Sequence, residues 1–143
     1  RTQPLGRHGG DVQIIGTDIN GRVIRKAKEG IYTHYAVQKI PADSLGKYFT
    51  PIAGDRYTLS EAVKSRVAFH RHNLLRPFRQ GHFDLVLCRN VLIYFDAQSK
   101  REVLANLYES TKPGGYLITG FAESLMNIPS RFEYVKPTVY RRA

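Results

Sequence analysis

The segment FDLVLCRNVLIYFD, at positions 83–96, most constrains what this chain can fold into. Its first part, Phe83–Cys88, is an almost continuous apolar run that only Asp84 interrupts. Such a run is typical of a strand buried on both faces, as in a parallel sheet flanked by helices. Ligands of open α/β sheets bind at the carboxyl ends of the strands, where Arg89 and Asn90 stand. This polar pair either contacts a ligand or holds a loop together, and the spacing favours neither reading.

Length and composition limit the class of protein. The chain has 143 residues, enough for one modest domain with a core, and no apolar segment long enough to cross a bilayer. The single cysteine, Cys88, suits a reducing cytosol, and neither it nor His70 and His72 belongs to a metal-binding cluster. The net charge of +10 is dispersed, with no nucleic-acid motif. An acidic protein partner or solubility accounts for that charge, and nucleic-acid binding is not expected.

The first part of the chain predicts a strand followed by a short helix. Residues 1–10 hold a proline, three glycines and scattered charge, which is typical of a linker. The strand is expected at Asp11–Asp18 and the helix at Gly21–Glu29, with Asn20 as its N-cap. An acid between a strand and a helix can accept hydrogen bonds from both ribose hydroxyls of a cofactor. Asp18 fits that role, and it fits the cap of a turn equally well.

The middle of the chain, from 31 to 65, has an irregular hydrophobic pattern. Tyr48–Pro51 and Arg56–Leu59 are predicted to be short strands on either side of a turn at 53–55. We interpret them as a small antiparallel insertion rather than as part of the main sheet.

The second half of the chain predicts a helix between buried strands. The helix is capped by Asp96 or Ser99, carries the apolar stripe Val103, Leu104, Leu107 and Tyr108, and stops at 112–115. Strands are expected before it at 65–70 and after it at 116–119, with a closing antiparallel pair at 132–135 and 138–141. Parallel strands end at one edge of a sheet, so Glu123 and Ser124 are expected at the same edge as Arg89 and Asn90.

The order of these elements resembles the later part of an S-adenosylmethionine-dependent methyltransferase, which has an acid after its second strand and a PGG turn before its fifth. The run CRNVLIYF at 88–95 is more specific. Together with IIGTDI at 14–19, NLL at 73–75, LITGFAESL at 117–125 and PTVYRR at 137–142, it is similar to the CheR-type chemotaxis receptor methyltransferases. The resemblance runs from about 11 to 141.

The resemblance implies an α/β fold. It is a Rossmann-like, mostly parallel sheet with a terminal antiparallel hairpin, and the antiparallel insertion, at about 45–67, is the family's small β-subdomain. The implied reaction is methyl transfer from S-adenosylmethionine to the carboxylate of a receptor glutamate, with S-adenosylhomocysteine as the product. The implied partner is the cytoplasmic domain of a methyl-accepting chemotaxis receptor, which places the protein in the cytoplasm.

The resemblance also assigns roles to individual residues. The cofactor-binding residues would be Asp18 at the ribose, Asn73 and Leu74 beside the adenine, and Arg89 and Asn90 near the reacting end. Arg89 and Tyr94 would be the catalytic residues, with Tyr94 close to the sulfonium and its methyl group. Without the resemblance, an interfacial core position is the commoner fate of such a tyrosine.

One part of the family pattern has no match in this sequence. Members carry an N-terminal helical domain, a first strand and a glycine-rich loop before the equivalent of Asp11. That first strand is central in the sheet, so a chain without it has two strand edges with unmet backbone groups. We therefore expect residues 1–143 to be an incomplete C-terminal catalytic domain that binds S-adenosylmethionine poorly by itself. Rearrangement, dimerisation through strand edges or a separate segment would fill the gap.

Two other functions stay open at this point. One is a catalytically inactive receptor-binding or regulatory module on a degenerate methyltransferase scaffold. The joint retention of the five polar site residues, Asp18, Asn73, Arg89, Asn90 and Tyr94, favours the enzyme, because a binding module does not need them all. The other is a methyltransferase for nucleic acid or a small molecule, and the absence of an Asn-Pro-Pro-Tyr type of signature counts against it.

Overall fold

The computed structural model describes residues 12–143. The predicted linker at 1–10, and the first residue of the predicted strand Asp11–Asp18, lie outside the described residues. The chain divides between Arg71 and His72 into two compact units. None of the described helices is both long enough and apolar enough to span a membrane.

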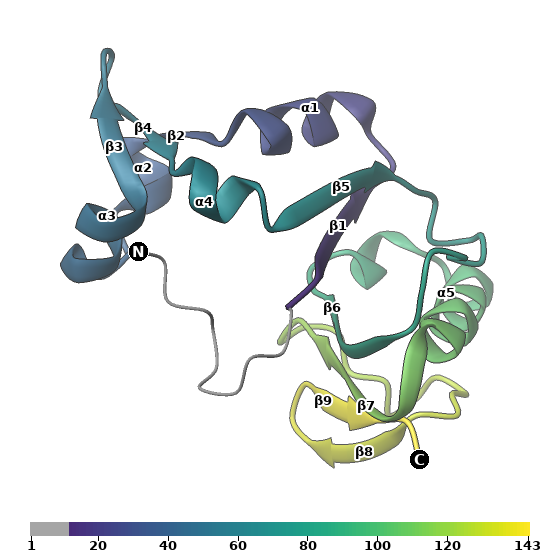
Figure 1. The fold of residues 1–143 in the computed structure, drawn as a ribbon. Coiled ribbons are helices and arrows are strands. Elements are labelled where there is room, and N and C mark those ends of the chain that lie inside the picture. The colour runs from purple at the N-terminus through teal and green to yellow at the C-terminus, as the bar shows by residue number, and fades with distance from the viewer. Residues whose placement is uncertain (1–11) are drawn as a thin grey trace. The chain divides into compact units, whose positions relative to one another are not determined.

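The first unit contains a parallel strand pair and the helix that was predicted after it. Strand β1 (Ile14–Asp18) pairs with β5 (Val67–Arg71), and helix α1 (Gly21–Glu29) follows β1 (Figure 1). Asn20 caps the helix, because its side chain accepts a hydrogen bond from the Arg22 N–H at 2.9 Å. The left-handed conformation of Gly30, at a φ of 65°, ends it. The predicted helix and its cap are confirmed.

The same unit holds a small antiparallel sheet of three strands. Their order is β2 (Ile31–Thr33), β4 (Arg56–Leu59) and β3 (Phe49–Ile52). Short helices α2 (His34–Val37), α3 (Ala42–Tyr48) and α4 (Glu61–Lys64) accompany it. The sheet thus takes its third strand from outside the expected range of 45–67. Three residues are too few to show an alternating pattern, which is why the sequence did not reveal β2.

The second unit contains a four-stranded sheet that ends in the predicted antiparallel pair. Its strand order is β6 (Phe83–Cys88), β7 (Thr111–Thr119), β9 (Val139–Arg141) and β8 (Glu133–Lys136). Only β6 and β7 are parallel (Figure 1). Between them lie the short 3₁₀ helix η1 (Leu92–Tyr94) and the long helix α5 (Ala97–Ser110).

The end of α5 and the start of β7 differ from the prediction. The helix ends at Ser110 and the strand begins at Thr111, so the predicted stop at 112–115 lies within the strand. The pairing of β6 with β7 shifts register between Phe83 and Leu85, which accommodates the proline and glycines as an irregular strand start. A Cβ atom on Gly115 would lie 3.0 Å from the Asp84 carbonyl oxygen, so glycine permits this close pairing.

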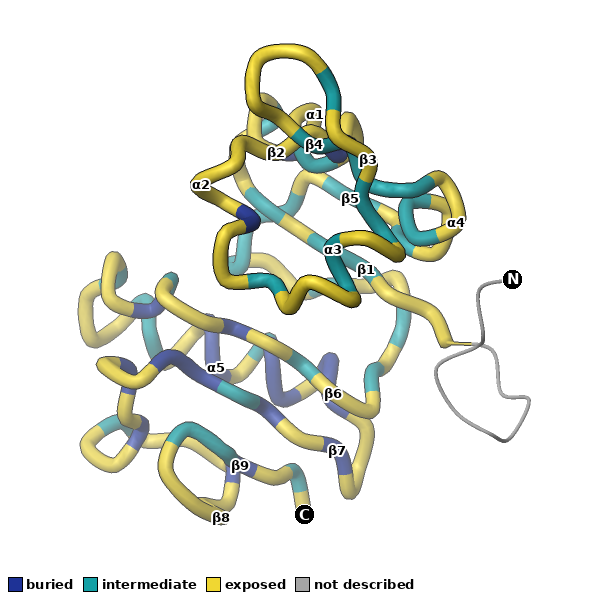
Figure 2. The backbone as a smooth tube through the Cα atoms, turned by 90° about the vertical axis from the view of Figure 1, so that its left-hand side faces the viewer, coloured by how far each residue is buried: buried dark blue, intermediate teal, exposed yellow. Residues whose placement is uncertain are grey.

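The hydrophobic core of the second unit lies between α5 and its sheet. All four residues of the predicted helix stripe are buried (Figure 2): Val103, Leu104, Leu107 and Tyr108. They belong to one cluster with Leu92 of η1, Leu117 of β7 and Tyr140 of β9. Burying this cluster stabilises the unit and fixes the carboxyl ends of β6 and β7.

Several strand edges, including those of β1 and β6, have no neighbouring strand among residues 12–143. β1 pairs only with β5 and β6 pairs only with β7, so the described strands do not form one continuous sheet. Leu85 and Leu87 on β6 are 52% and 64% exposed, which is unusual for a strand of this composition. The predicted α/β class agrees with this arrangement, in which each unit contains one parallel strand pair.

Candidate functional site

The carboxyl ends of β6 and β7 lie side by side in the second unit. Cys88 is paired with Thr119 in parallel register, so Arg89 and Gly120 directly follow neighbouring strand ends. The predicted convergence of polar residues at this edge is confirmed for Asn90 and Glu123, because the backbone N–H of Asn90 donates a hydrogen bond to the Glu123 carboxylate.

A single carboxylate organises this edge. The Glu123 side chain is 5% exposed and accepts hydrogen bonds from four backbone N–H groups. Its Oε1 accepts from Asn90 at 2.5 Å and Gly120 at 2.9 Å, and its Oε2 accepts from Val91 at 2.9 Å and Ile93 at 3.2 Å. The loop after β6 is therefore tied to the turn after β7 through one side chain.

The ionisation of Glu123 follows from these contacts. Burial raises the pKa of its carboxyl group, but hydrogen bonds from the surrounding backbone N–H groups, those of Asn90 and Gly120 foremost, outweigh this effect and lower the pKa. Glu123 is therefore an anion at neutral pH.

The two predicted residues after β6 differ in conformation and contacts. Asn90 has a φ of 59°, in the left-handed region that asparagine tolerates better than most residues. Arg89 is exposed, with its guanidinium carbon 5.5 Å from the ring centre of Phe121. Phe121 is itself 88% exposed. A planar cation on an exposed ring at the end of β6 is available to a ligand carboxylate.

Tyr94 does not occupy a core position. It is the last residue of η1 and its side chain is 83% exposed, so the reading of a core aromatic is wrong. Its backbone N–H donates to the Val91 carbonyl at 3.1 Å, which holds η1 in a tight turn. The ring is free to meet a ligand at this edge.

Asn73 and Leu74 belong to the second unit and are held by helix α5. The Asn106 side chain donates to the Leu74 carbonyl at 2.9 Å. The Asn73 Oδ1 accepts from the Leu75 N–H at 3.0 Å, which leaves its side-chain amide as a donor. Both residues are half-buried, so the segment is fixed but still accessible.

Asp18 belongs to the first unit and ends β1. It is half-buried, and its Oδ1 accepts from the Asn20 N–H at 2.8 Å, so the turn-capping reading is correct. The same carboxylate has a second oxygen that can accept ligand hydroxyls, so capping and ribose binding are compatible. Arg71 of β5 donates to the Ile19 carbonyl at 2.8 Å and fixes the chain beside it.

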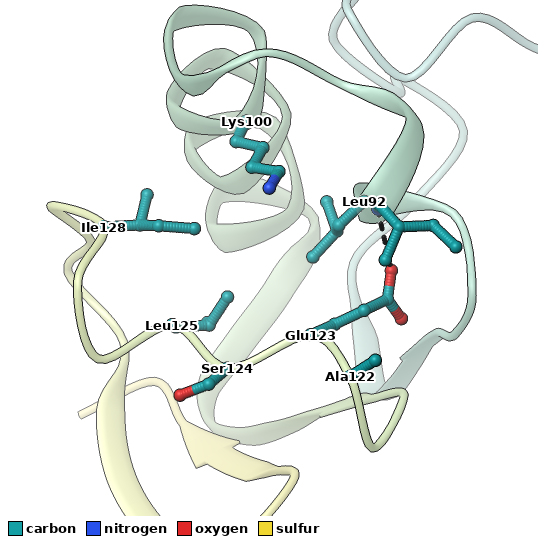
Figure 3. Close-up of a pocket in the computed structure, with 8 residues that line it drawn as sticks. Leu92, Lys100, Ala122, Glu123, Ser124, Leu125 and Ile128 are labelled. Atoms are coloured by element: carbon teal, nitrogen blue, oxygen red, sulfur yellow. Dashed lines mark hydrogen bonds between the residues drawn. The ribbon is translucent and has the colours of Figure 1, made fainter.

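A small pocket adjoins the carboxylate (Figure 3). Its volume of about 40 Å³ gives room for about one water molecule, so it is not a site for a nucleoside. Figure 3 shows Glu123 and Lys100 on its wall, together with Leu92 and Ile128. Among residues 12–143, no group of three or more histidine, cysteine or acidic side chains is placed to hold a metal ion.

The comparison with protein families gives one match that covers nearly the whole chain. The sequence profile described as "CheR methyltransferase, SAM binding domain" matches residues 3–141.

Curated relatives agree with that match. "Chemotaxis protein methyltransferase 1" of Pseudomonas aeruginosa is 39% identical, over 97% of this chain and 52% of its own length. "Chemotaxis protein methyltransferase Cher2" of Pseudomonas putida is 38% identical, over 92% of this chain and 49% of its own length. "Chemotaxis protein methyltransferase" of Borreliella burgdorferi is 35% identical, over 92% of this chain and 47% of its own length. The chain spans about half the length of the curated relatives it matches.

Some solved structures are distantly similar to this chain. The N-methyltransferase NodS of Bradyrhizobium japonicum, in complex with S-adenosyl-L-homocysteine, has a TM-score of 0.46 at 18% identity, over 75% of this chain and 40% of that one. The LepI complex with SAM has a TM-score of 0.47 at 14% identity, over 78% of this chain and 20% of that one.

Proposed function

Because the chain belongs to the family of CheR methyltransferase SAM-binding domains, we propose that it is the cofactor-binding, catalytic part of a protein-glutamate O-methyltransferase. The cofactor of this family is S-adenosylmethionine. The proposed substrates are glutamate side chains on the cytoplasmic domains of chemotaxis receptors. The observation that carries the proposal is the family match from residue 3 to residue 141, which includes every predicted site residue.

The donors and acceptors of the site residues fit the parts of the cofactor. The Asp18 carboxylate suits the ribose hydroxyls, and the fixed Asn73–Leu74 segment suits the edge and face of an adenine. The Arg89 guanidinium suits the carboxylate of the methionine part, since its planar fork binds carboxylates in two places. Asn90 adds a side-chain amide beside it. These assignments give the ribose, the adenine and the methionine carboxylate of S-adenosylmethionine a complementary group each.

The proposed reaction needs alignment more than proton transfer. A glutamate carboxylate is ionised at neutral pH and is already a nucleophile, so no general base is required. S-adenosylmethionine supplies an electrophilic methyl group on a positively charged sulfur. The residues of this chain then contribute by orienting the acceptor and excluding water. Tyr94 provides a rigid ring and a hydroxyl for that purpose, and Arg89 provides a charge that attracts carboxylates.

The proposed partner also fits the charge of the chain. A net charge of +10 favours an acidic protein surface, such as a receptor segment rich in glutamates. The edges of β1 and of β6 that pair with no strand among residues 12–143 are each a further candidate for contact, since unpaired strand edges bind further strands. We expect the isolated chain to cover these strand edges by dimerisation, by rearrangement or with a separate segment.

The first test is calorimetric titration with S-adenosylhomocysteine. This chain is compared with a version of it that is extended at the N-terminus. We expect only the extended form to bind tightly, because the backbone that holds the methionine part is not among the matched motifs. Tight binding by this chain alone would contradict that expectation. Binding by neither form would favour the inactive receptor-binding module.

The second test is methylation of a receptor cytoplasmic fragment with methyl-labelled S-adenosylmethionine. Label that is released as methanol in mild base identifies a methyl ester, whereas N-methyl groups resist base. We expect Arg89→Ala to lower cofactor affinity by roughly 10- to 100-fold, the effect of losing a charged hydrogen bond. Arg101→Ala on the exposed face of α5 is the matched control and should change nothing. Base-stable label would refute the proposed glutamate substrate.

A second pair of variants tests the aromatic hydroxyl. Tyr94→Phe should lower the methylation rate by about 3- to 10-fold, the effect of one neutral hydrogen bond. Tyr116→Phe on β7 removes a hydroxyl from another exposed tyrosine and should leave the rate unchanged. Equal rates for the two variants would remove Tyr94 from the proposed catalytic set.

A further inference from the structure

Glu123 is a buried anion whose hydrogen-bond partners are backbone N–H groups rather than a cation. Within residues 12–143, the structure gives no salt bridge between Glu123 and a lysine or arginine, although Lys100 lines the adjoining pocket. Burying a charge is costly unless hydrogen bonds compensate it. Four backbone donors supply that compensation, and three of them belong to the segment that follows β6.

The donors join sequence positions that are far apart. Asn90 and Glu123 are separated by 33 positions, and the contact fixes the first residue after Arg89. Val91 and Ile93 extend the contact to the start of η1, the short helix that ends at Tyr94. One carboxylate therefore holds the backbone at three positions, 90, 91 and 93, between the proposed site residues Arg89 and Tyr94.

The loop after β6 has a strained backbone conformation at Asn90 that other contacts must stabilise. Asn90 lies in the left-handed region, a conformation that costs free energy for a residue with a side chain. Gly120 contributes from the other side, because a Cβ atom there would lie 2.6 Å from both Asn90 Oδ1 and Glu123 Oε1. The glycine leaves the room that the carboxylate needs to reach its donors.

We propose that Glu123 is a positioning residue for the methyl-transfer site. It preforms the backbone of the Arg89–Asn90 segment and the orientation of η1, so that the cofactor meets a site already in shape. The inference rests on the proposed function in one respect, that Arg89, Asn90 and Tyr94 contact the cofactor. Glu123 itself touches no substrate in this scheme.

Glu123→Gln is the decisive variant. The side chain keeps its size, but its NH₂ group faces two backbone N–H donors that had an oxygen to bind. The matched control is Thr111→Val at the other end of β7, which removes the buried hydrogen bond from the Thr111 hydroxyl to the Leu107 carbonyl at 2.7 Å. Both variants lower stability, but only Glu123→Gln alters the loop after β6.

The kinetic measurement uses the natural polypeptide that contains these residues. We expect Glu123→Gln to raise KM for S-adenosylmethionine about 10-fold or more, as expected when hydrogen bonds that shape a binding site are lost. KM for the receptor should stay unchanged, and Thr111→Val should alter neither constant. An unchanged cofactor KM in Glu123→Gln, with a stability loss like that of Thr111→Val, would overturn the proposal because it indicates a purely structural role.

A spectroscopic measurement on this chain separates the proposal from the proposed function. Glu123→Gln should shift the amide ¹H resonances of Asn90, Val91 and Ile93 and speed their hydrogen exchange, whereas Thr111→Val should not. If the N-terminally extended wild-type protein fails to bind S-adenosylhomocysteine while these amides of the shorter chain respond, the proposed function fails and the positioning of the loop stands. Amides that do not respond would overturn the positioning role whatever the binding result.

Discussion

The Oδ1 atom of Asn90 lies 2.6 Å from the point that a Cβ atom on Gly120 would occupy. The backbone nitrogen of Asn90 lies 3.1 Å from the same point. Real Cβ atoms do not approach other atoms so closely, so a side chain at position 120 must push the loop after β6 away. The glycine is therefore required by space at the junction between β6 and β7.

Gly120→Ala should destabilise the protein and weaken cofactor binding. We expect a loss of about 1–3 kcal/mol in the free energy of unfolding, the usual cost of overpacking a buried position. Gly46→Ala is the control: it lies inside α3 with no atom within 4 Å of the added Cβ, so it should stabilise by about 0.5–1 kcal/mol. Urea unfolding followed by circular dichroism measures the free energy of unfolding of both variants. Wild-type stability in Gly120→Ala would show that the loop moves at no cost.

Cys88 should be unreactive in the folded protein. Burial, together with the nearby Glu123 carboxylate, raises the pKa of its thiol to about 11. Only the thiolate reacts with iodoacetamide, so alkylation at pH 8 should be roughly 100-fold slower than in the urea-unfolded chain. Glu123→Gln should speed the native reaction, because it removes a charge that raises the pKa. Mass spectrometry of timed samples gives the rates, and equal rates in folded and unfolded chains would contradict this account.

Local signals explain which parts of the fold could be predicted from the sequence. Asn20 and Gly30 mark the two ends of α1, and the structure uses both as caps. Phe83–Cys88 is a strand because its apolar run has no helical period. Each of these signals lies within or beside the element that it specifies, so no knowledge of distant partners is needed.

The parts that could not be predicted depend on distant partners. Thr111 begins β7 only because β6 accepts an irregular register opposite the glycines. Ile31–Thr33 is a strand only because Arg56–Leu59 lies beside it. The sequence places Glu123 at the right edge, but its role depends on donors about 30 positions earlier. An acid within the otherwise apolar and small-residue run at 117–125 is the signal that could have indicated a buried carboxylate.

Acid should remove the contribution of Glu123 to stability. The pKa of this group in the folded protein lies below its ordinary value of 4.5, so the unfolded chain binds its proton more readily. The contribution is therefore present above about pH 4.5 and is lost as the pH falls through the folded pKa. The difference in unfolding free energy between wild type and Glu123→Gln should be largest at neutral pH and shrink below pH 4.5.

Thermal unfolding between neutral and acidic pH measures that difference. Glu102→Gln, at an exposed position on α5, is the control and should follow the wild-type curve. A constant gap between wild type and Glu123→Gln across the whole pH range would mean that the backbone N–H groups do not stabilise the charged form.

Thr138 should be a site where stability can be gained. It has a φ of 69°, in the left-handed region, and with Pro137 it connects the paired residues Lys136 and Val139 of the terminal hairpin. A β-branched residue is strained there, whereas glycine and asparagine adopt this conformation more easily. Thr138→Gly or Thr138→Asn should therefore raise the free energy of unfolding by about 0.5–1 kcal/mol.

The matched control for this hairpin variant lies in an ordinary strand. Thr50 is an exposed residue of β3 whose φ is not in the left-handed region, so Thr50→Gly should destabilise by about 1 kcal/mol. The two glycine variants are thus expected to change stability in opposite directions. The carbonyl of Thr138 accepts from the Thr119 N–H at 2.9 Å, and neither substitution removes that backbone contact. If Thr138→Gly destabilised as much as Thr50→Gly, strain at the turn would not limit the stability of the hairpin that closes the sheet.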